Sequence, residues 1–175
     1  MEFITRGESV TFFHFPHAAS LRRVWSWQKY PYAEPSLERM AYHEAGHVVL
    51  LEWLGLDSPR AVATTTDGLT QLPAHGEVVA PPDPTGELAA VAAAMFHAGI
   101  AAELIHFGMH WHGPIYLLHD DHKRAEALLR AVFGAHSSGA HAFAQRVALH
   151  VLSQRWGRVQ EIAAVLADKG EWSAQ

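Results

Sequence analysis

One Ala-rich stretch, LAAVAAAMFHAGIAAELIHFG at residues 88–108, constrains the fold more than any other part of the sequence. Its residues are apolar on all sides of a helix, and such a helix is buried in a protein core or in a membrane. A membrane span needs about 20 mostly apolar residues and tolerates a central charge poorly. His97, Glu103 and His106 interrupt this stretch. We therefore expect a core helix surrounded by other helices, and no membrane anchor.

The remaining segments predict a mainly helical chain with one small sheet. Ser36 suits the N-cap of a helix that runs to about Leu54, where Gly55 can end it. Asp67-Gly68, between β-branched residues, is typical of a β-hairpin. A further short strand is expected in HGEVVAPP, and Thr85 is a possible N-cap of the Ala-rich helix. Three more helices are expected, over about 121–133, over about 138–156 and in the GRVQEIAAVLADKG segment. The predicted fold class is predominantly α (α+β), with the sheet around residues 60–80.

The first 35 residues differ in character from the rest. They mix eight aromatic side chains with three prolines and have no sustained hydrophobic period. We expect an N-terminal arm over residues 1–35, packed against the domain or a partner, and a single domain over residues 36–175.

Composition excludes several kinds of function. The chain has 13 Lys and Arg against 18 acidic residues, a net charge of −5, which disfavours a nucleic-acid partner. It contains no cysteine, so disulfides and thiolate metal sites are ruled out. Its 14 histidines leave His, Asp and Glu as the ligands for any transition metal. No secretory signal precedes the domain, and we expect a cytoplasmic protein.

The segment HEAGH, residues 43–47, has the spacing of a metal-binding helix. Histidines four residues apart lie one turn apart on the same face, so His43 and His47 can bind one zinc ion. Glu44 can then take a proton from the zinc-bound water as it attacks a carbonyl, and pass it to the leaving amine. Ala45 and Gly46 keep the helix slim at this point. The alternative is two hydrogen-bonded histidines on an amphipathic helix with no metal.

A third ligand is expected in the segment LLHDDHKRAEALL. It offers His119, Asp120, Asp121 and His122 near a helix start. An aspartate at this position is often only a helix cap, and spacing alone does not choose among the four.

Three segments together resemble the peptidase domain of the FtsH-type ATP-dependent zinc metalloproteases. They are HEAGH, the AGIAAEL segment at 98–104, which is similar to the family's Gly-Arg-Ala-Ala-Glu with Ile100 in place of arginine, and DDHKRA. In the family's register, Asp121 lies four residues before Ala125 and matches the third zinc ligand. The C-terminal RWGRVQEIAAVLADKGEWS is also similar to the family's closing helix.

This resemblance implies a helical metallopeptidase-like fold with zinc as its cofactor. His43, His47 and Asp121 would bind the ion, Glu44 would be the catalytic base, and Glu103 would orient a ligand histidine from the second shell. The sequence contains no P-loop motif, so we expect peptide-bond hydrolysis independent of ATP. The implied partner is a flexible polypeptide substrate, which could pair with an edge strand of the 60–80 sheet, and a homo-oligomer is compatible with this function.

The alternative function is a catalytically inactive, zinc-stabilised protein-interaction module. A structural zinc site closes its fourth position with a protein ligand, for which His119 or His122 is available. The loop GMHWHGP, with His110, Trp111 and His112, is expected to pack; the alternatives are that it lines a cleft or holds a second metal. His97 and His106, on the Ala-rich helix, are expected to be hydrogen-bonded core histidines.

Overall fold

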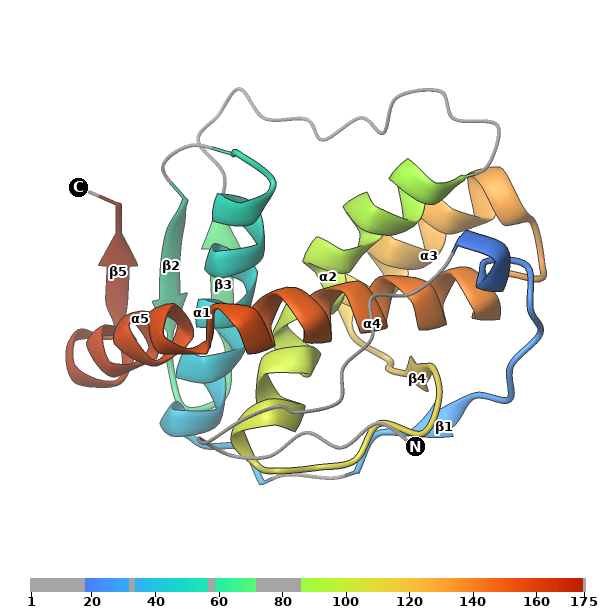
Figure 1. The fold of residues 1–175 in the computed structure, drawn as a ribbon. Coiled ribbons are helices and arrows are strands. Elements are labelled where there is room, and N and C mark those ends of the chain that lie inside the picture. Colours follow the sequence, from blue (N-terminus) through green and yellow to red (C-terminus); the bar gives the residue numbers. More distant parts are fainter. Residues whose placement is uncertain (1–17, 32–33, 57–58, 72–85, 175) are drawn as a thin grey trace.

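A computed structural model describes residues 18–31, 34–56, 59–71 and 86–174. The chain is mostly helical with a small sheet, which confirms the predominantly α fold class (Figure 1). The helices are α1 (Leu37–Trp53), α2 (Glu87–His106), α3 (Asp120–Phe133), α4 (Ser138–Gln154) and α5 (Trp156–Lys169).

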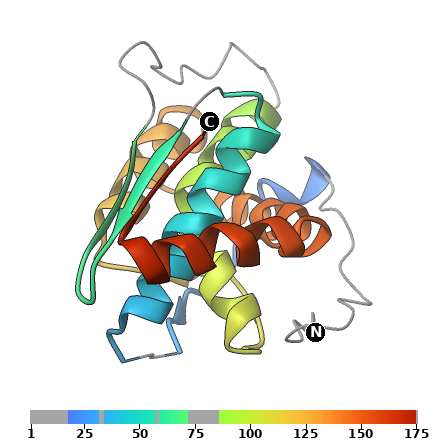
Figure 2. The ribbon, with the colours of Figure 1, turned by 90° about the vertical axis from the view of Figure 1, so that its left-hand side faces the viewer.

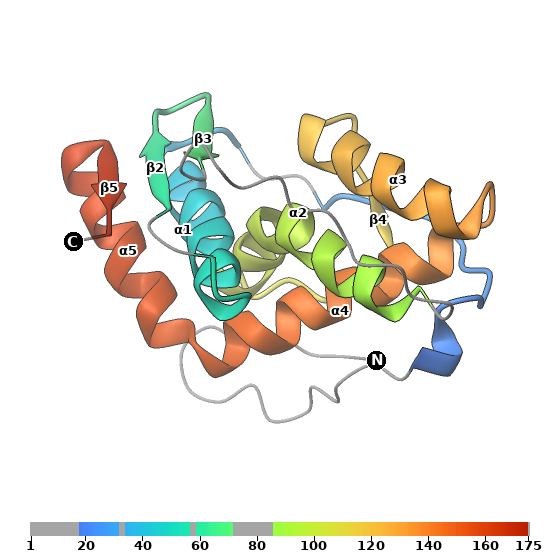
Figure 3. The same ribbon diagram turned by 90° about the horizontal axis from the view of Figure 1, so that it is seen from above.

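The Ala-rich helix α2 lies at the centre of the fold, as its composition predicts. It packs against α1, α3 and α4 (Figures 1 and 3). Within the described residues, α2 is the one helix long and apolar enough to cross a membrane, yet 83% of its most apolar window is buried inside the protein. That burial is consistent with a core helix of a soluble protein.

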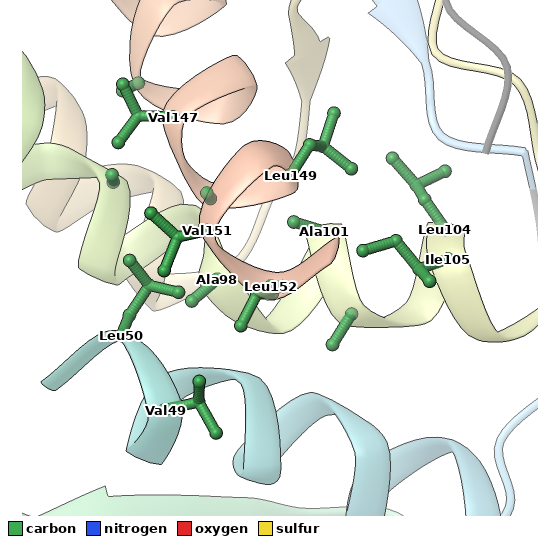
Figure 4. Close-up of a cluster of buried hydrophobic side chains, with 14 of the residues drawn as sticks. Val49, Leu50, Ala98, Ala101, Leu104, Ile105, Val147, Leu149, Val151 and Leu152 are labelled. Atoms are coloured by element: carbon green, nitrogen blue, oxygen red, sulfur yellow. The ribbon is translucent and has the colours of Figure 1, made fainter. Parts of the chain in front are cut away.

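Small side chains let the central helices approach closely. Aliphatic side chains of α1 and α4 fill the space on either side of α2 (Figure 4). The labelled core residues are Val49, Leu50, Ala98, Ala101, Leu104, Ile105, Val147, Leu149, Val151 and Leu152, each at most 5% exposed. Burial of this apolar surface is the main force that holds the helices together.

A three-stranded antiparallel sheet covers one side of α1 (Figures 2 and 3). Strands β2 (Arg60–Ala63) and β3 (Gly68–Gln71) form the predicted hairpin, in which Ala63 pairs with Gly68. Strand β5 (Glu171–Ser173), which we did not predict, adds to the other edge of β2 in the order β3-β2-β5. The strand predicted in HGEVVAPP lies outside the described residues.

The described part of the N-terminal arm packs against the helical body. A short 3-10 helix η1 (Ala18–Ser20) is followed by Leu21, which is only 2% exposed. Strand β1 (Gln28–Lys29) pairs in parallel with β4 (Ile115–Tyr116). The arm thereby brings Trp27 and Tyr30 close to the helices that carry the predicted site.

Helix boundaries agree with the predictions to within a few residues. Ser36 is the N-cap of α1, and its side chain accepts a hydrogen bond of 3.1 Å from the backbone N–H of Arg39. Helix α2 begins later than we predicted: its N-cap is Gly86, with a φ of 75°, and Thr85 lies outside the described residues. A Cβ at Gly86 would collide with Phe133, so this position needs glycine for space as well as for its backbone conformation.

Candidate metal centre

The histidines of HEAGH face α2 from the middle of α1. Both are nearly buried, His43 at 7% and His47 at 8% exposure. Their ring centroids are 4.9 Å apart, as expected for residues one turn apart on one face. The predicted pairing of the two histidines is therefore present.

Asp121, in the first turn of α3, completes a triangle with the two histidines. His43 Nε2 lies 3.2 Å from His47 Nε2, and Asp121 Oδ2 lies 3.4 Å from the first and 3.3 Å from the second. Ligand atoms about 2.0–2.1 Å from a tetrahedral zinc ion are separated by about 3.3 Å. The three side chains thus fit one zinc ion with little rearrangement.

The outer nitrogen of each histidine has a hydrogen-bond acceptor. His43 Nδ1 lies 2.6 Å from Glu103 Oε1, and His47 Nδ1 lies 2.7 Å from the backbone carbonyl of Met95. Protons on the two Nδ1 atoms leave both Nε2 lone pairs directed at the centre. Metal-binding histidines in proteins are oriented in this way.

Glu103 is fully buried and therefore does not face solvent. Its second oxygen, Oε2, accepts hydrogen bonds from the Arg39 guanidinium at 2.6 Å and from the Tyr30 hydroxyl. Burial favours the neutral acid, but the hydrogen bonds from His43, Arg39 and Tyr30 outweigh it and lower the pKa of Glu103. Burial and the negative charge of Glu103 raise the pKa of Tyr30.

In the absence of a metal, the neighbouring carboxylates favour the protonated form of His43. Burial lowers the pKa of His43, but its hydrogen bonds to Asp121 and Glu103 raise it more, to about 10. Burial raises the pKa of Asp121, yet hydrogen bonds from His119, His43 and His47 leave it well below its usual range. At neutral pH the metal-free centre therefore holds a carboxylate and a protonated His43, and a metal ion must displace that proton.

Glycines allow α1 and α2 to approach at the centre. A Cβ on Gly46 would lie 2.5 Å from the carbonyl oxygen of Ala98 and 2.8 Å from Ala102 Cβ. A Cβ on Gly99 would overlap the imidazole ring of His43. Gly99 lies four residues before Glu103, so both residues face His43 from one side of α2.

Glu44 points from α1 toward the hairpin. It is 3% exposed, and its Oε2 accepts a hydrogen bond of 2.5 Å from the Thr70 hydroxyl of β3. A Cβ on Gly68 would collide with the Glu44 carboxylate. The hairpin therefore positions the predicted base, with glycine at the point of closest approach.

The other candidates for the third ligand occupy different places. Asp120 is exposed and bonds Lys123 at 3.0 Å. His119 is half exposed, with Nδ1 3.2 Å from Asp121 Oδ2. His122 turns away from this centre to join His97 and His141 in a second cluster.

His97 is buried and its Nε2 lies 2.9 Å from His141 Nδ1, as expected for a hydrogen-bonded core histidine, but it is also part of a second histidine cluster. The rings of His97, His122 and His141 lie 4.8–5.8 Å apart in pairs. Burial lowers the pKa of all three, that of His122 to about 4. His106 is hydrogen-bonded to Glu38 at 2.8 Å, also as expected.

Within the loop between α2 and α3, Trp111 is packed, in agreement with the first prediction for this loop, whereas His110 and His112 are exposed. Trp111 is 4% exposed, and its indole N–H donates to Gln145 Oε1 at 2.9 Å. His110 and His112 have ring centroids 5.9 Å apart in this loop.

Sequence reasoning missed Thr70, Tyr30, Arg39 and Gly99. For Gly99, the i, i+4 spacing to Glu103 was a signal that could have identified it. The other three reach the centre from the hairpin, the arm and the first turn of α1, and no local pattern marks them.

Comparison of the chain with protein-family models, with curated proteins and with solved structures finds no match.

Proposed function

We propose that this chain is a zinc-dependent metallopeptidase-like protein that hydrolyses peptide bonds without an ATPase motor of its own. The observation that carries the proposal is the triangle of His43 Nε2, His47 Nε2 and Asp121 Oδ2, with edges of 3.2–3.4 Å, next to the buried acid Glu44. Three protein ligands are the usual number in catalytic zinc sites, where the fourth position is left for water or substrate.

Zinc, when bound, supplies a Lewis acid that lowers the pKa of a water ligand to about 7 and polarises a carbonyl group. The role of Glu44 is to move protons. The Thr70 hydroxyl occupies Oε2 of Glu44, so Oε1 can accept a proton from the attacking water and return it to the leaving amine. A structural zinc site would not need a carboxylate held in this way.

The geometry of the hairpin favours an extended polypeptide as the substrate. Within the described residues, β3 pairs on one edge only, with β2, and carries Thr70 beside Glu44. An extended chain added to the free edge of β3 would run past the carboxylate, with backbone hydrogen bonds supplying affinity. We accordingly propose a flexible or unfolded polypeptide as the substrate class. The proposed location is the cytoplasm.

His119 supports a competing function, a zinc-stabilised interaction module without activity. Its Nδ1 lies 3.2 Å from Asp121 Oδ2, close enough to the centre for His119 to close the fourth zinc position after a small movement. The two functions differ in what Glu44 and His119 do, and this difference can be measured.

The first test is the zinc content of purified protein by elemental mass spectrometry. Relative to wild type, Asp121→Ala should lose one equivalent of zinc per chain, and Glu44→Gln should lose none. A casein or peptide-library assay then compares wild type with Glu44→Gln and His119→Gln. If the protein is a peptidase, wild type and His119→Gln should cleave the substrate, and Glu44→Gln should not.

Two results would refute the peptidase. One is an Asp121→Ala protein with the same zinc content as wild type after zinc is supplied. The other is a zinc-loaded wild type that cleaves no peptide of the library faster than Glu44→Gln does. The interaction module would be established if zinc-loaded wild type showed no such cleavage and His119→Gln lost one zinc per chain relative to wild type.

A further inference from the structure

Three histidines from three helices meet in the core beside the HEAGH centre. His97 of α2, His122 of α3 and His141 of α4 are 1%, 3% and 0% exposed. One ring nitrogen from each lies within 4.8 Å of the other two. None of these residues belongs to the triangle of His43, His47 and Asp121.

The hydrogen bonds of His141 give it the form of a metal ligand. Its Nε2 donates to Glu126 Oε2 at 2.7 Å, and the Ser137 hydroxyl donates to the same oxygen at 2.9 Å. With the proton on Nε2, the lone pair of Nδ1 points into the cluster, where His97 Nε2 lies 2.9 Å away. A carboxylate on the outer nitrogen is the common arrangement for a metal-binding histidine.

His122 supplies a second, independent observation. Its ring stacks on that of His141, with centroids 4.8 Å apart and an interplanar angle of 11°. Its Nδ1 is buried, and the structure gives this atom no hydrogen-bond partner. A hydrogen-bonded chain from Glu126 through His141 to His97 would leave this nitrogen unsatisfied, which is unfavourable in a core.

We propose that His97, His122 and His141 form a second metal site, which binds a divalent transition-metal ion such as zinc through three imidazoles. An all-imidazole set selects zinc, copper, nickel or cobalt, whereas magnesium and calcium require oxygen ligands. The rings of Trp27 and Tyr116 pack on the cluster, at 5.1 Å from His141 and 4.6 Å from His122. They give the ion a largely apolar surrounding.

The second ion has a structural consequence for the first centre. His122 follows Asp121 directly in the first turn of α3, so an ion on His122 ties that turn to α2 and α4. The turn is then held where Asp121 meets His43 and His47. The site exists whether or not the first centre is a peptidase, because its ligands are different residues.

The test is a count of bound zinc in purified, chelator-stripped protein after equilibrium dialysis against zinc, by elemental mass spectrometry. Wild type should bind two equivalents, and His122→Phe and Asp121→Asn one each. The double variant should bind none. Phenylalanine keeps the ring stacked on His141, and His136→Phe, at an exposed histidine, is the matched control that should bind two.

A second variant guards against a folding defect in His122→Phe, which circular dichroism would reveal. Glu126→Gln removes the carboxylate from His141 at a partly exposed position. In the Asp121→Asn background it should weaken zinc binding by about 10- to 100-fold. Cobalt(II) should give a tetrahedral visible band in Asp121→Asn that is absent from Asp121→Asn/His122→Phe.

The outcomes separate the two sites. Zinc binding that is unchanged by both His122→Phe and Glu126→Gln overturns the second site. A single zinc that Asp121→Asn retains and His122→Phe loses supports the second site while it refutes the proposed peptidase centre. Two zinc ions bound to wild type, with one left in His122→Phe and one left in Asp121→Asn, support both metal sites.

Discussion

His43 Nδ1 donates a hydrogen bond of 2.6 Å to Oε1 of Glu103, a carboxylate with no exposed surface. The other oxygen of Glu103 is held by Arg39 and Tyr30. A residue of the arm, one of α1 and one of α2 thus cooperate to orient a single imidazole. Four residues upstream of Glu103, Gly99 leaves the space that this imidazole occupies.

We expect Glu103→Gln to weaken zinc binding at the HEAGH centre by about 10- to 100-fold, because the amide is a poorer acceptor and its NH2 group would face donors. Competition with a chromophoric chelator measures the dissociation constant. Glu161→Gln, which changes an exposed carboxylate of α5, is the matched control and should bind zinc as wild type does. Wild-type affinity in Glu103→Gln would contradict the orienting role.

Gly99→Ala should destabilise the protein by about 1–3 kcal/mol, the usual cost of overpacking a core, and should also reduce zinc content. The added methyl group would displace the His43 ring. Urea unfolding measures the free energy of unfolding. Gly157→Ala is the control: this helical position of α5 has open space around a Cβ, so stability should rise by up to about 1 kcal/mol. Equal effects of the two substitutions would argue against close packing at His43.

Thr70→Val should lower kcat for peptide cleavage by roughly 10- to 100-fold, because Glu44 loses the hydroxyl that orients its carboxylate. Zinc content should not change, since the Thr70 hydroxyl bonds Glu44, which is not one of the three proposed ligands. Thr70→Ser retains a hydroxyl and should restore most of the rate. A Thr70→Val enzyme with normal kcat would show that the hairpin does not position the base.

Zinc binding should release about one proton at pH 7. His43 has its pKa raised from 6.5 to about 10 in the metal-free protein, and the ion displaces its proton. Calorimetric titrations in buffers of different ionisation enthalpy measure the release. Affinity should therefore increase by about tenfold for each pH unit between about 6.5 and 10. A pH-independent affinity in this range would contradict the raised pKa.

The same shift sets a pH dependence for the metal-free protein. A raised pKa in the folded state means that the ion pairs of His43 stabilise fully below pH 6.5, and that this contribution is lost as pH rises through about 10. The free energy of unfolding should decline over that range in wild type and decline less in His43→Gln. Urea unfolding at a series of pH values provides the comparison.

Local patterns in the sequence determined the elements that carry the centre. The apolar run of α2 predicts a buried central helix, because apolar side chains on every side require burial and the polar residues His97, Glu103 and His106 disfavour a membrane. The i, i+4 spacing places His43 and His47 on one face of α1, because a helix repeats every 3.6 residues. Asp67-Gly68 predicts the hairpin that brings Thr70 to Glu44. These inferences involve residues close together in the chain, where backbone geometry alone is sufficient.

Tertiary structure decided which distant side chains meet. Successive residues on a helix point about 100° apart, so in the first turn of α3 Asp121 faces the HEAGH histidines and His122 faces His97 and His141. The family register matched Asp121, but spacing alone left His119, Asp120 and His122 open, because the orientation of α3 depends on its packing against α2 and α4. The contacts of Tyr30 with Glu103 and of β5 with β2 arise in the same way. They depend on where chain segments far apart in sequence come to rest, and that is determined by packing of the whole core.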